Sequence, residues 1–206
     1  CPIDVGRCMA AVIDPIQRCV VMWSWETGGF RNNKGECIAT ATQNISVNMA
    51  CLWDGDLLRE LLDKNQISKY DYINGGVKNL LTAEGCVSNN GTKATPCIQG
   101  DIIGDWREEV LFRTEDNKNL RLYVSTHDTD YRFHCFAEEP VYRISMATQN
   151  VAYNQPTQPG FYFGADLGKC FPEKEIKVDG NSVTFDAGMD YDSYSWSIGG
   201  NERKCT

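Results

Sequence analysis

The chain has 206 residues, of which 42% are hydrophobic and 23% are charged, the balance of a folded globular protein rather than a disordered one. Its formal net charge of −8 argues against a nucleic-acid-binding protein, because such proteins neutralise phosphates with Lys and Arg. No stretch approaches the roughly 18 consecutive apolar residues of a membrane-spanning helix, so we expect no membrane span.

Short strands separated by turns are predicted along the N-terminal half. Val20–Trp25 is an apolar run of strand length, and Asn48–Trp53 is a second strand that leads into the acidic turn Asp54–Asp56. Leu57–Asp63 (LLRELLD) would be helical by propensity alone. The preceding Trp-Asp-Gly turn and the strand-like segment Ile67–Tyr72 that follows favour a β-strand instead.

The central part of the chain predicts an antiparallel meander. Three alternating segments, Glu109–Thr114, Leu120–Thr126 and Tyr142–Thr148, are joined by polar connections, as in one blade of a β-propeller. Residues 7–80 predict a second, decorated blade. Propellers close with about 4–8 blades of roughly 40–50 residues, so about three blades cannot close a ring. We therefore predict an all-β fold of antiparallel propeller-like blades, a partial β-propeller belonging to something larger.

The ten cysteines include no Cys-x-x-Cys pair, which argues against zinc-binding and thioredoxin-like motifs. Only two histidines are present, so a histidine-rich metal site is not expected either. An even number of cysteines favours an oxidising, extracellular compartment. We predict that most of the ten form disulfides, and that Cys86 and Cys97, which bracket a short polar loop, pair with each other.

Four segments carry a resemblance to a known family. They are Trp53–Asp63 (WDGDLLRELLD), Leu80–Cys97 (LLTAEGCVSNNGTKATPC), Gly100–Asn117 (GDIIGDWREEVLFRTEDN) and Val141–Pro156 (VYRISMATQNVAYNQP). The chain resembles the C-terminal part of the rhamnogalacturonan lyases of polysaccharide lyase family 11, from about residue 6 to about residue 164. The resemblance implies a calcium-bearing β-propeller that cuts the pectin backbone by β-elimination, here as a fragment or truncated form.

The pattern changes after residue 164. A linker-like segment is followed by short alternating strands that end in an aromatic Tyr-Ser-Trp. We predict two parts: residues 1–164 as the partial propeller, and residues 165–206 as a linker with a small β-rich extension.

A calcium loop is predicted at Asp101, Asp105 and Glu109, which lie on a loop that enters a strand, with Gly104 available for a tight turn. Calcium takes six to eight oxygen ligands, and carboxylates spaced in this way resemble the calcium loops of integrin-type propellers. The alternative is an acidic turn solvated by water. Ile103 departs from the pattern, because such loops often carry another Asp there.

Asp54, Asp56 and Glu60 form a second candidate calcium loop. The counterpart near the N-terminus has Val12 and Val21 where the family tends to carry acidic residues, so we expect no calcium site there.

A saccharide-binding loop is predicted at residues 90–93. The resemblance implies that Asn90, Gly91 and Thr92, together with Tyr153, contact the sugar. Amide and hydroxyl groups hydrogen-bond to sugar hydroxyls, and glycine lets the backbone approach a ring. The alternatives are a type I′ turn without function, which Asn-Gly favours, and a glycosylated Asn-x-Thr site.

β-Elimination removes the C5 proton of a galacturonate whose carboxylate must be neutralised, because the transition state is enolate-like. Lysine or tyrosine can act as the base, and we assign these roles to Lys93, as base or carboxylate partner, and to Tyr153. Arg107 and Arg143 are secondary neutralisers or structural ion pairs.

The competing hypothesis is a non-catalytic extracellular module that binds pectin or self-assembles. Too few blades, the cysteines and the lost acidic positions favour it, whereas the saccharide-binding loop favours the lyase.

Overall fold

The computed structural model describes residues 6–17, 20–25, 29–39, 45–151, 155–161, 175–179, 182–186 and 204–205. In these residues the chain forms short antiparallel strands and little helix, which confirms the predicted all-β class. None of the described helices is long and apolar enough to cross a membrane.

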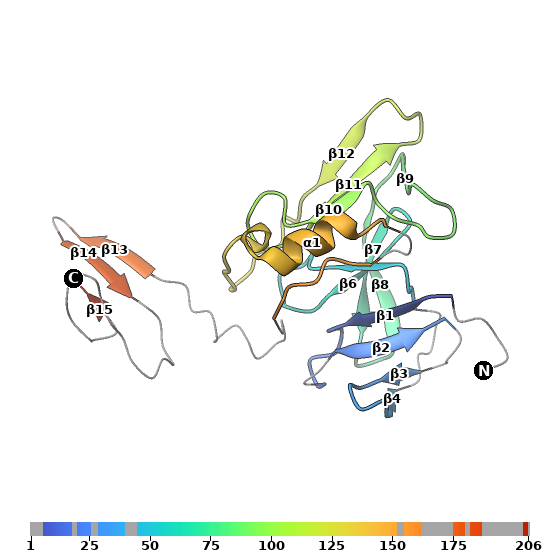
Figure 1. Cartoon of the computed structure of the whole chain (residues 1–206), viewed down its shortest axis with the longest axis horizontal. Coiled ribbons are helices and arrows are strands. Elements are labelled where there is room, and N and C mark those ends of the chain that lie inside the picture. Colours follow the sequence, from blue (N-terminus) through green and yellow to red (C-terminus); the bar gives the residue numbers. More distant parts are fainter. Residues whose placement is uncertain are drawn as a thin grey trace.

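Consecutive strands form the first two sheets, each with four strands in chain order (Figure 1). The first sheet contains β1 (Cys8–Ala11), β2 (Val21–Ser24), β3 (Phe30–Arg31) and β4 (Cys37–Ala39). The second contains β5 (Met49–Cys51), β6 (Glu60–Asp63), β7 (Gln66–Asp71) and β8 (Gly76–Thr82). The prediction of one decorated blade over residues 7–80 was wrong, because this segment supplies two separate sheets.

The third sheet is built around β11. β9 and β10 both pair with one side of β11, near its two ends, and β12 pairs with the other side. Its strands are β9 (Cys86–Val87), β10 (Ile98–Gly100), β11 (Glu109–Thr114) and β12 (Leu120–Tyr123). A further three-stranded antiparallel sheet contains β13 (Glu175–Asp179), β14 (Ser182–Asp186) and β15 (Lys204–Cys205).

The second sheet is buried on both faces. Leu61 and Tyr70 belong to a buried cluster shared with the first sheet, whereas Leu62 and Ile67 belong to a cluster shared with the third. Neighbouring residues of a strand point to opposite faces, so the apolar pair Leu61–Leu62 contributes to both cores. The helix propensity of residues 57–63 is overridden because β6 is sandwiched between two sheets.

An equivalent backbone hydrogen bond joins the first sheet to the second and the second sheet to the third. The amide of Arg59 donates to the carbonyl of Val12 at 2.7 Å, linking the first sheet to the second. The amide of Glu108 donates to the carbonyl of Leu52, also at 2.7 Å, linking the second to the third. In both cases the acceptor follows the first strand of one sheet, and the donor lies just before a long inner strand of the next. The three sheets therefore stack in a repeated geometry.

One predicted strand is wrong: Tyr142–Thr148 lies in the helix α1 (Pro140–Thr148), which follows the short 3₁₀ helix η1 (Phe136–Glu138). Pro140 occupies the first turn, where its missing N–H costs nothing. The Glu139 side chain caps the helix by accepting hydrogen bonds from the amides of Val141 (3.0 Å) and Tyr142 (2.6 Å). These local signals favour a helix over a third strand of the meander.

A buried carboxylate holds α1 against the sheets. Glu108 is 0% exposed, and one of its oxygens accepts hydrogen bonds from the Leu52 amide and the Gln99 side chain, both at 2.9 Å. The other oxygen accepts from the hydroxyls of Tyr142 (2.7 Å) and Thr157. One side chain thus connects the second sheet, the third sheet, α1 and the segment after it.

The predicted disulfides are also wrong. Six of the ten cysteines are free in the described residues, Cys86 and Cys97 among them. Cys86 is buried between the second and third sheets, where its sulfur lies 3.5 Å from the hydroxyl of Tyr123. Cys97 is half-buried, and its thiol donates to the side-chain oxygen of Asn89 at 3.5 Å. The disulfide was predicted because Cys86 and Cys97 bracket a short loop in the sequence. In the structure the two sulfurs lie in different environments.

Candidate functional site

A groove of about 430 Å³ lies where loops from all three sheets meet. Its walls come from the residues before β1, after β2 and before β5, from the β6–β7 turn, and from the loop between β9 and β10. The lining residues are Gly6, Arg7, Trp25, Ser46, Val47, Asn48, Asp63, Lys64, Gly91 and Thr92. The volume is that of a ligand site, typically about 300–1,000 Å³.

The predicted saccharide-binding loop contributes Gly91 and Thr92 to this groove. The Asn90 side-chain oxygen accepts hydrogen bonds from the amides of Thr92 and Lys93, both at 3.1 Å, so Asn90 shapes the loop. Neither Asn90 nor Gly91 has a positive φ, which a type I′ turn requires at both positions, so that alternative is wrong. A Cβ added to Gly91 would meet nothing within 4 Å, which leaves the backbone open to a ligand.

The other predicted substrate residues have different positions. Lys93 is half-buried beside the groove rather than in its lining, and Tyr153 lies outside the described residues. Arg107 is bound to the carboxylate of Asp105 and donates to the carbonyl of His127 at 2.5 Å. The geometry gives Arg107 a structural role.

Arg143 also has structural contacts. Its guanidinium donates to the carbonyls of Ala137 and Glu138, each at 3.0 Å, and so ties η1 to α1.

Most of the groove residues were missed by the sequence reasoning, among them Arg7, Trp25, Asn48 and Lys64. Arg7 and Asn48 each have a buried polar atom without a hydrogen-bond partner, Nη1 and Oδ1 respectively. Trp25 is 62% exposed, although tryptophan is usually much more buried. The only signal in the sequence was that Trp25 ends the apolar run of β2. Arg7 and Asn48 gave none, because they reach the groove from different sheets.

The residues 52–60, which we name the Asp54 loop, gather their carboxylates around a lysine. One oxygen each from Asp54, Asp56 and Glu60 lies within 4.8 Å of the others, an arrangement that could hold a metal ion. The ammonium of Lys69, from β7, contacts all three carboxylates, at 2.5 Å from Asp56 and 3.2 Å from Glu60. This loop therefore has an internal cation.

Burial dominates the electrostatics of the Asp54 loop. It raises the pKa of Glu60 to about 8, although the nearby Lys69 opposes this shift. Burial also acts to lower the pKa of Lys69, but attraction by Glu60 and hydrogen bonds to Asp54 and Asp56 outweigh it and raise that pKa. The side-chain oxygen Oδ1 of Asp54 remains buried without a partner.

The residues 101–109, which we name the Asp101 loop, hold two unpartnered carboxylate oxygens. Asp101 and Glu109 are each 1% exposed. Asp101 Oδ2 accepts from the Phe136 amide at 2.7 Å, and Glu109 Oε2 accepts from the amides of Ile102 (2.8 Å) and Ile103 (3.0 Å). Asp101 Oδ1 and Glu109 Oε1 are buried with no partner. Buried, unpartnered carboxylate oxygens are costly, and a cation would satisfy them.

Burial raises the pKa of Asp101, and it raises the pKa of Glu109 to about 6 against the opposing effect of the Ile103 and Ile102 amides. Asp105, the third predicted ligand, is engaged by Arg107 instead. The structure thus brings Asp101 and Glu109 into one buried loop and commits Asp105 to an ion pair.

The sequence matches the family model described as rhamnogalacturonan lyase family 11, C-terminal domain, over residues 1–172. The chain belongs to rhamnogalacturonan lyase family 11. It is 51% identical over 166 residues to rhamnogalacturonan endolyase YesW of Bacillus subtilis (strain 168), covering 81% of this chain and 26% of that protein. It is 43% identical over 195 residues to rhamnogalacturonan exolyase YesX of the same organism, covering 87% and 32%.

Solved structures of the family agree with these matches. The crystal structure of YesW aligns with a TM-score of 0.74 and 50% identity over 79% of this chain and 27% of that one. The Bacillus licheniformis rhamnogalacturonan lyase PL11 aligns with the same TM-score and 49% identity, over 79% and 27%. This family 11 chain thus spans about a quarter to a third of the length of the curated relatives it matches.

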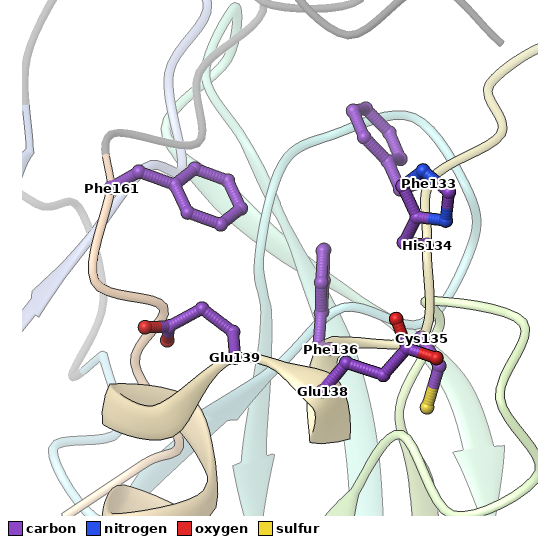
Figure 2. A pocket seen from close by; sticks show the side chains of 7 residues that line it. All are labelled: Phe133, His134, Cys135, Phe136, Glu138, Glu139 and Phe161. Atoms are coloured by element: carbon purple, nitrogen blue, oxygen red, sulfur yellow. The ribbon is translucent and has the colours of Figure 1, made fainter. Parts of the chain in front are cut away.

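A second hollow in this family 11 chain is lined by aromatic rings. It encloses about 270 Å³ and lies against the N-terminus of α1. Figure 2 shows the rings of Phe133, Phe136 and Phe161 around it, with the carboxylates of Glu138 and Glu139 nearby. None of the predicted substrate residues that the structure describes lines it, and its acidic residues disfavour an anionic sugar. The groove at Gly91 and Thr92 is therefore the candidate substrate site.

Proposed function

We propose that the chain is part of an extracellular rhamnogalacturonan lyase that cuts the pectin backbone by β-elimination. The observation that carries this is that Gly91 and Thr92, two exposed residues of the saccharide-binding loop, line a groove together with the cations Arg7 and Lys64. The chain is acidic overall, so these two cations supply the local positive potential that an anionic polymer requires. A polymeric substrate also favours action outside the cell.

The groove suits each step of an elimination. Arg7 pairs with the galacturonate carboxylate and so stabilises the charge that develops as the C5 proton leaves. Lys93 or Tyr153 accepts that proton, and the electron pair of the C5–H bond forms the C4=C5 double bond of an unsaturated uronate. The C4–O4 bond breaks with its electron pair on O4, which takes up a proton and leaves as the hydroxyl of the neighbouring sugar. Gly91 gives the backbone close access to the sugar ring, and Thr92 offers its hydroxyl to the sugar.

We propose further that the three stacked sheets are blades of a β-propeller completed by the rest of a longer chain. The repeated backbone bond between successive sheets supports this, because radial repetition of one blade is the principle of the propeller. Residues 1–164 form the blade-bearing part, and residues 165–206, which contain β13–β15, form a linker and β-rich extension.

Calcium fits the Asp101 loop, where Asp101 and Glu109 would hold it through their unpartnered oxygens. When bound, the ion supplies positive charge that neutralises two buried carboxylates and fastens the loop to β11. The Asp54 loop has Lys69 in this role.

The test is the reaction of the full-length protein on rhamnogalacturonan, followed by the near-ultraviolet absorbance of the unsaturated uronate. Lys93→Ala should lower turnover by roughly 10²–10⁴-fold if Lys93 is the base. Lys118→Ala, at the exposed β11–β12 turn, is the control and should keep wild-type turnover. A parent that binds pectin but forms no unsaturated product would instead support the carbohydrate-binding module.

A further inference from the structure

The sequence contains two Asn-Gly pairs, Asn74–Gly75 and Asn90–Gly91. Asparagine is chemically labile, and most of all before glycine, because glycine has no Cβ to hinder the attack of its backbone nitrogen on the asparagine side chain. Both asparagines are exposed, so water reaches both. Any difference in their reactivity therefore comes from their local contacts.

The Asn74–Gly75 pair is held in a turn by Asp71. The Gly75 amide donates to the carbonyl of Asp71 at 2.7 Å, and the Asn74 side-chain amide donates to Asp71 Oδ2 at 2.8 Å. The attacking nitrogen and the leaving nitrogen are thus both engaged. The Asp71 carboxylate also repels the negative charge that develops on the Asn74 side-chain oxygen during attack. These contacts protect the pair.

The Asn90–Gly91 pair lacks these restraints. Among the described residues, neither the Gly91 amide nor the Asn90 side-chain nitrogen donates a hydrogen bond. Asn90 Oδ1 accepts from the amides of Thr92 and Lys93, both at 3.1 Å, which folds the side chain back over the peptide bond that follows it. The same two amides stabilise negative charge that develops on Oδ1. The side chain is therefore both folded toward the Gly91 backbone and activated for attack.

We propose that Asn90 is a site of spontaneous deamidation that alters the saccharide-binding loop. The Gly91 nitrogen gives up its proton to hydroxide and bonds to Cγ of Asn90. The Cγ–Nδ2 bond then breaks, and Nδ2 takes a proton from water and leaves as ammonia. Water opens the resulting cyclic succinimide at either carbonyl. One product is aspartate at position 90, and the other is isoaspartate, in which the main chain runs through the side chain.

Either product changes the groove, a consequence that rests on the proposed function. Gly91 and Thr92 line the groove with the cations Arg7 and Lys64, and a new carboxylate at position 90 offsets their positive charge toward an anionic sugar. Aspartate keeps the hydrogen bonds from the Thr92 and Lys93 amides, because an ionised carboxylate is a stronger acceptor than an amide oxygen. Isoaspartate lengthens the main chain by a carbon and displaces Gly91 and Thr92.

The test is to incubate the folded 206-residue chain at mildly alkaline pH and to follow both Asn-Gly peptides by proteolysis and mass spectrometry. We expect Asn90 to convert roughly tenfold faster than Asn74, because the Gly75 amide must first break a hydrogen bond. In the urea-unfolded chain these contacts are absent, so the two asparagines should convert at similar rates.

Two variants separate the local causes. Gly91→Ala adds a Cβ that would meet nothing within 4 Å, so the fold is kept, and the conversion of Asn90 should slow several-fold. Asp71→Ala removes the carboxylate that holds Asn74, so Asn74 should convert faster while the rate at Asn90 stays the same. Far-ultraviolet circular dichroism and thermal melting confirm that each variant is folded.

The effect on the groove is measured by calorimetry with an oligosaccharide of the alternating rhamnogalacturonan backbone. Asn90→Asp should weaken binding by up to about fivefold, the effect of one exposed charge. The matched variant Asn74→Asp should bind like the wild type, because Asn74 does not line the groove.

Equal conversion of the two asparagines in the folded chain, or no slowing by folded Gly91→Ala, would overturn the modification site. Unchanged binding by folded Asn90→Asp would overturn its effect on the groove. If the fresh wild-type chain binds no oligosaccharide but Asn90 still converts faster than Asn74, the modification site stands and the assignment of the groove fails.

Discussion

The Asp54 loop and the Asp101 loop share one backbone but neutralise their carboxylates differently. In each, a glutamate at the start of the following strand accepts hydrogen bonds from the amides six and seven residues before it. Each has a glycine at positive φ, Gly55 (86°) and Gly104 (84°), and two residues later a side chain at positive φ, Leu57 (69°) and Trp106 (70°). The two loops therefore have the same backbone geometry, although only the Asp54 loop has a lysine beside its carboxylates among the described residues.

The difference lies in the neighbouring strand. β6 pairs with β7 so that Leu61 lies opposite Ser68, which places Lys69 beside Glu60. In the third sheet Val110 lies opposite Tyr123, so the position equivalent to Lys69 is Val124. One loop thus receives an ammonium group from its own sheet, and the other receives a valine. Two loops with one backbone thus differ in the charge of a single cross-strand residue.

Removing Lys69 should have the largest effect. Lys69→Met leaves three clustered carboxylates without their cation, and we expect the free energy of unfolding to fall by about 3 kcal/mol. Urea unfolding at neutral pH measures this. Lys78, which lies directly across from Lys69 on β8 and is exposed, provides the control Lys78→Met. Equal stability of the two variants would show that Lys69 does not neutralise the loop.

Calcium should stabilise the wild-type chain through the Asp101 loop. Binding to the folded state alone contributes about 2.7 kcal/mol at a hundredfold excess over Kd, seen as a rise in melting temperature that a chelator reverses. Asp101→Asn and Glu109→Gln should abolish the response. Asp105→Ala should reduce it less, because Arg107 already engages that carboxylate. A melting transition that a chelator leaves unmoved would show that no calcium site is there.

Placing a lysine at Val124 should make the Asp101 loop resemble the Asp54 loop. Val124→Lys positions an ammonium group beside Glu109, so we expect the stabilisation by calcium to fall below about 1 kcal/mol. Val124 is 41% exposed, so the substitution is sterically mild. Leu122→Lys, two residues earlier and within β12, is the control and should retain the calcium response. If both variants respond like the wild type, the cross-strand position does not govern the loop.

The smallest effect concerns the N-terminal cap of α1, the helix whose Tyr142 hydroxyl accepts a hydrogen bond from the Asp101 amide. Burial acts to raise the pKa of Glu139, but the amides of Val141, Tyr142 and Gly160 outweigh it and hold that pKa below its ordinary value of 4.5. The stability that the ionised cap contributes is therefore present above about pH 4.5 and is lost as the pH falls through the lowered pKa. Thermal melts of Glu139→Gln between about pH 3 and pH 7 should show a weaker pH dependence than the wild type. An unchanged dependence would contradict this role.

Local sequence signals predicted much of the fold. The runs at β2, β5, β6, β7, β11 and β12 alternate or carry turn residues at their ends, so the strands themselves were predictable. The helix α1 was missed because the alternation of residues 142–148 outweighed Pro140 and Glu139, which cap it. The saccharide-binding loop was found by resemblance, but its neighbours Arg7 and Trp25 were not, because they come from another sheet.

By itself, the sequence determined the all-β class, the family resemblance and the two acidic loops, because these depend on residues close together in the chain. The tertiary structure decided which charges meet. Among the described residues, Lys69 contacts the carboxylates of the Asp54 loop and no lysine does so in the Asp101 loop, Arg107 pairs with Asp105, and Cys86 and Cys97 do not form a disulfide. These outcomes depend on strand register and on the stacking of sheets, which bring together residues that no local pattern relates.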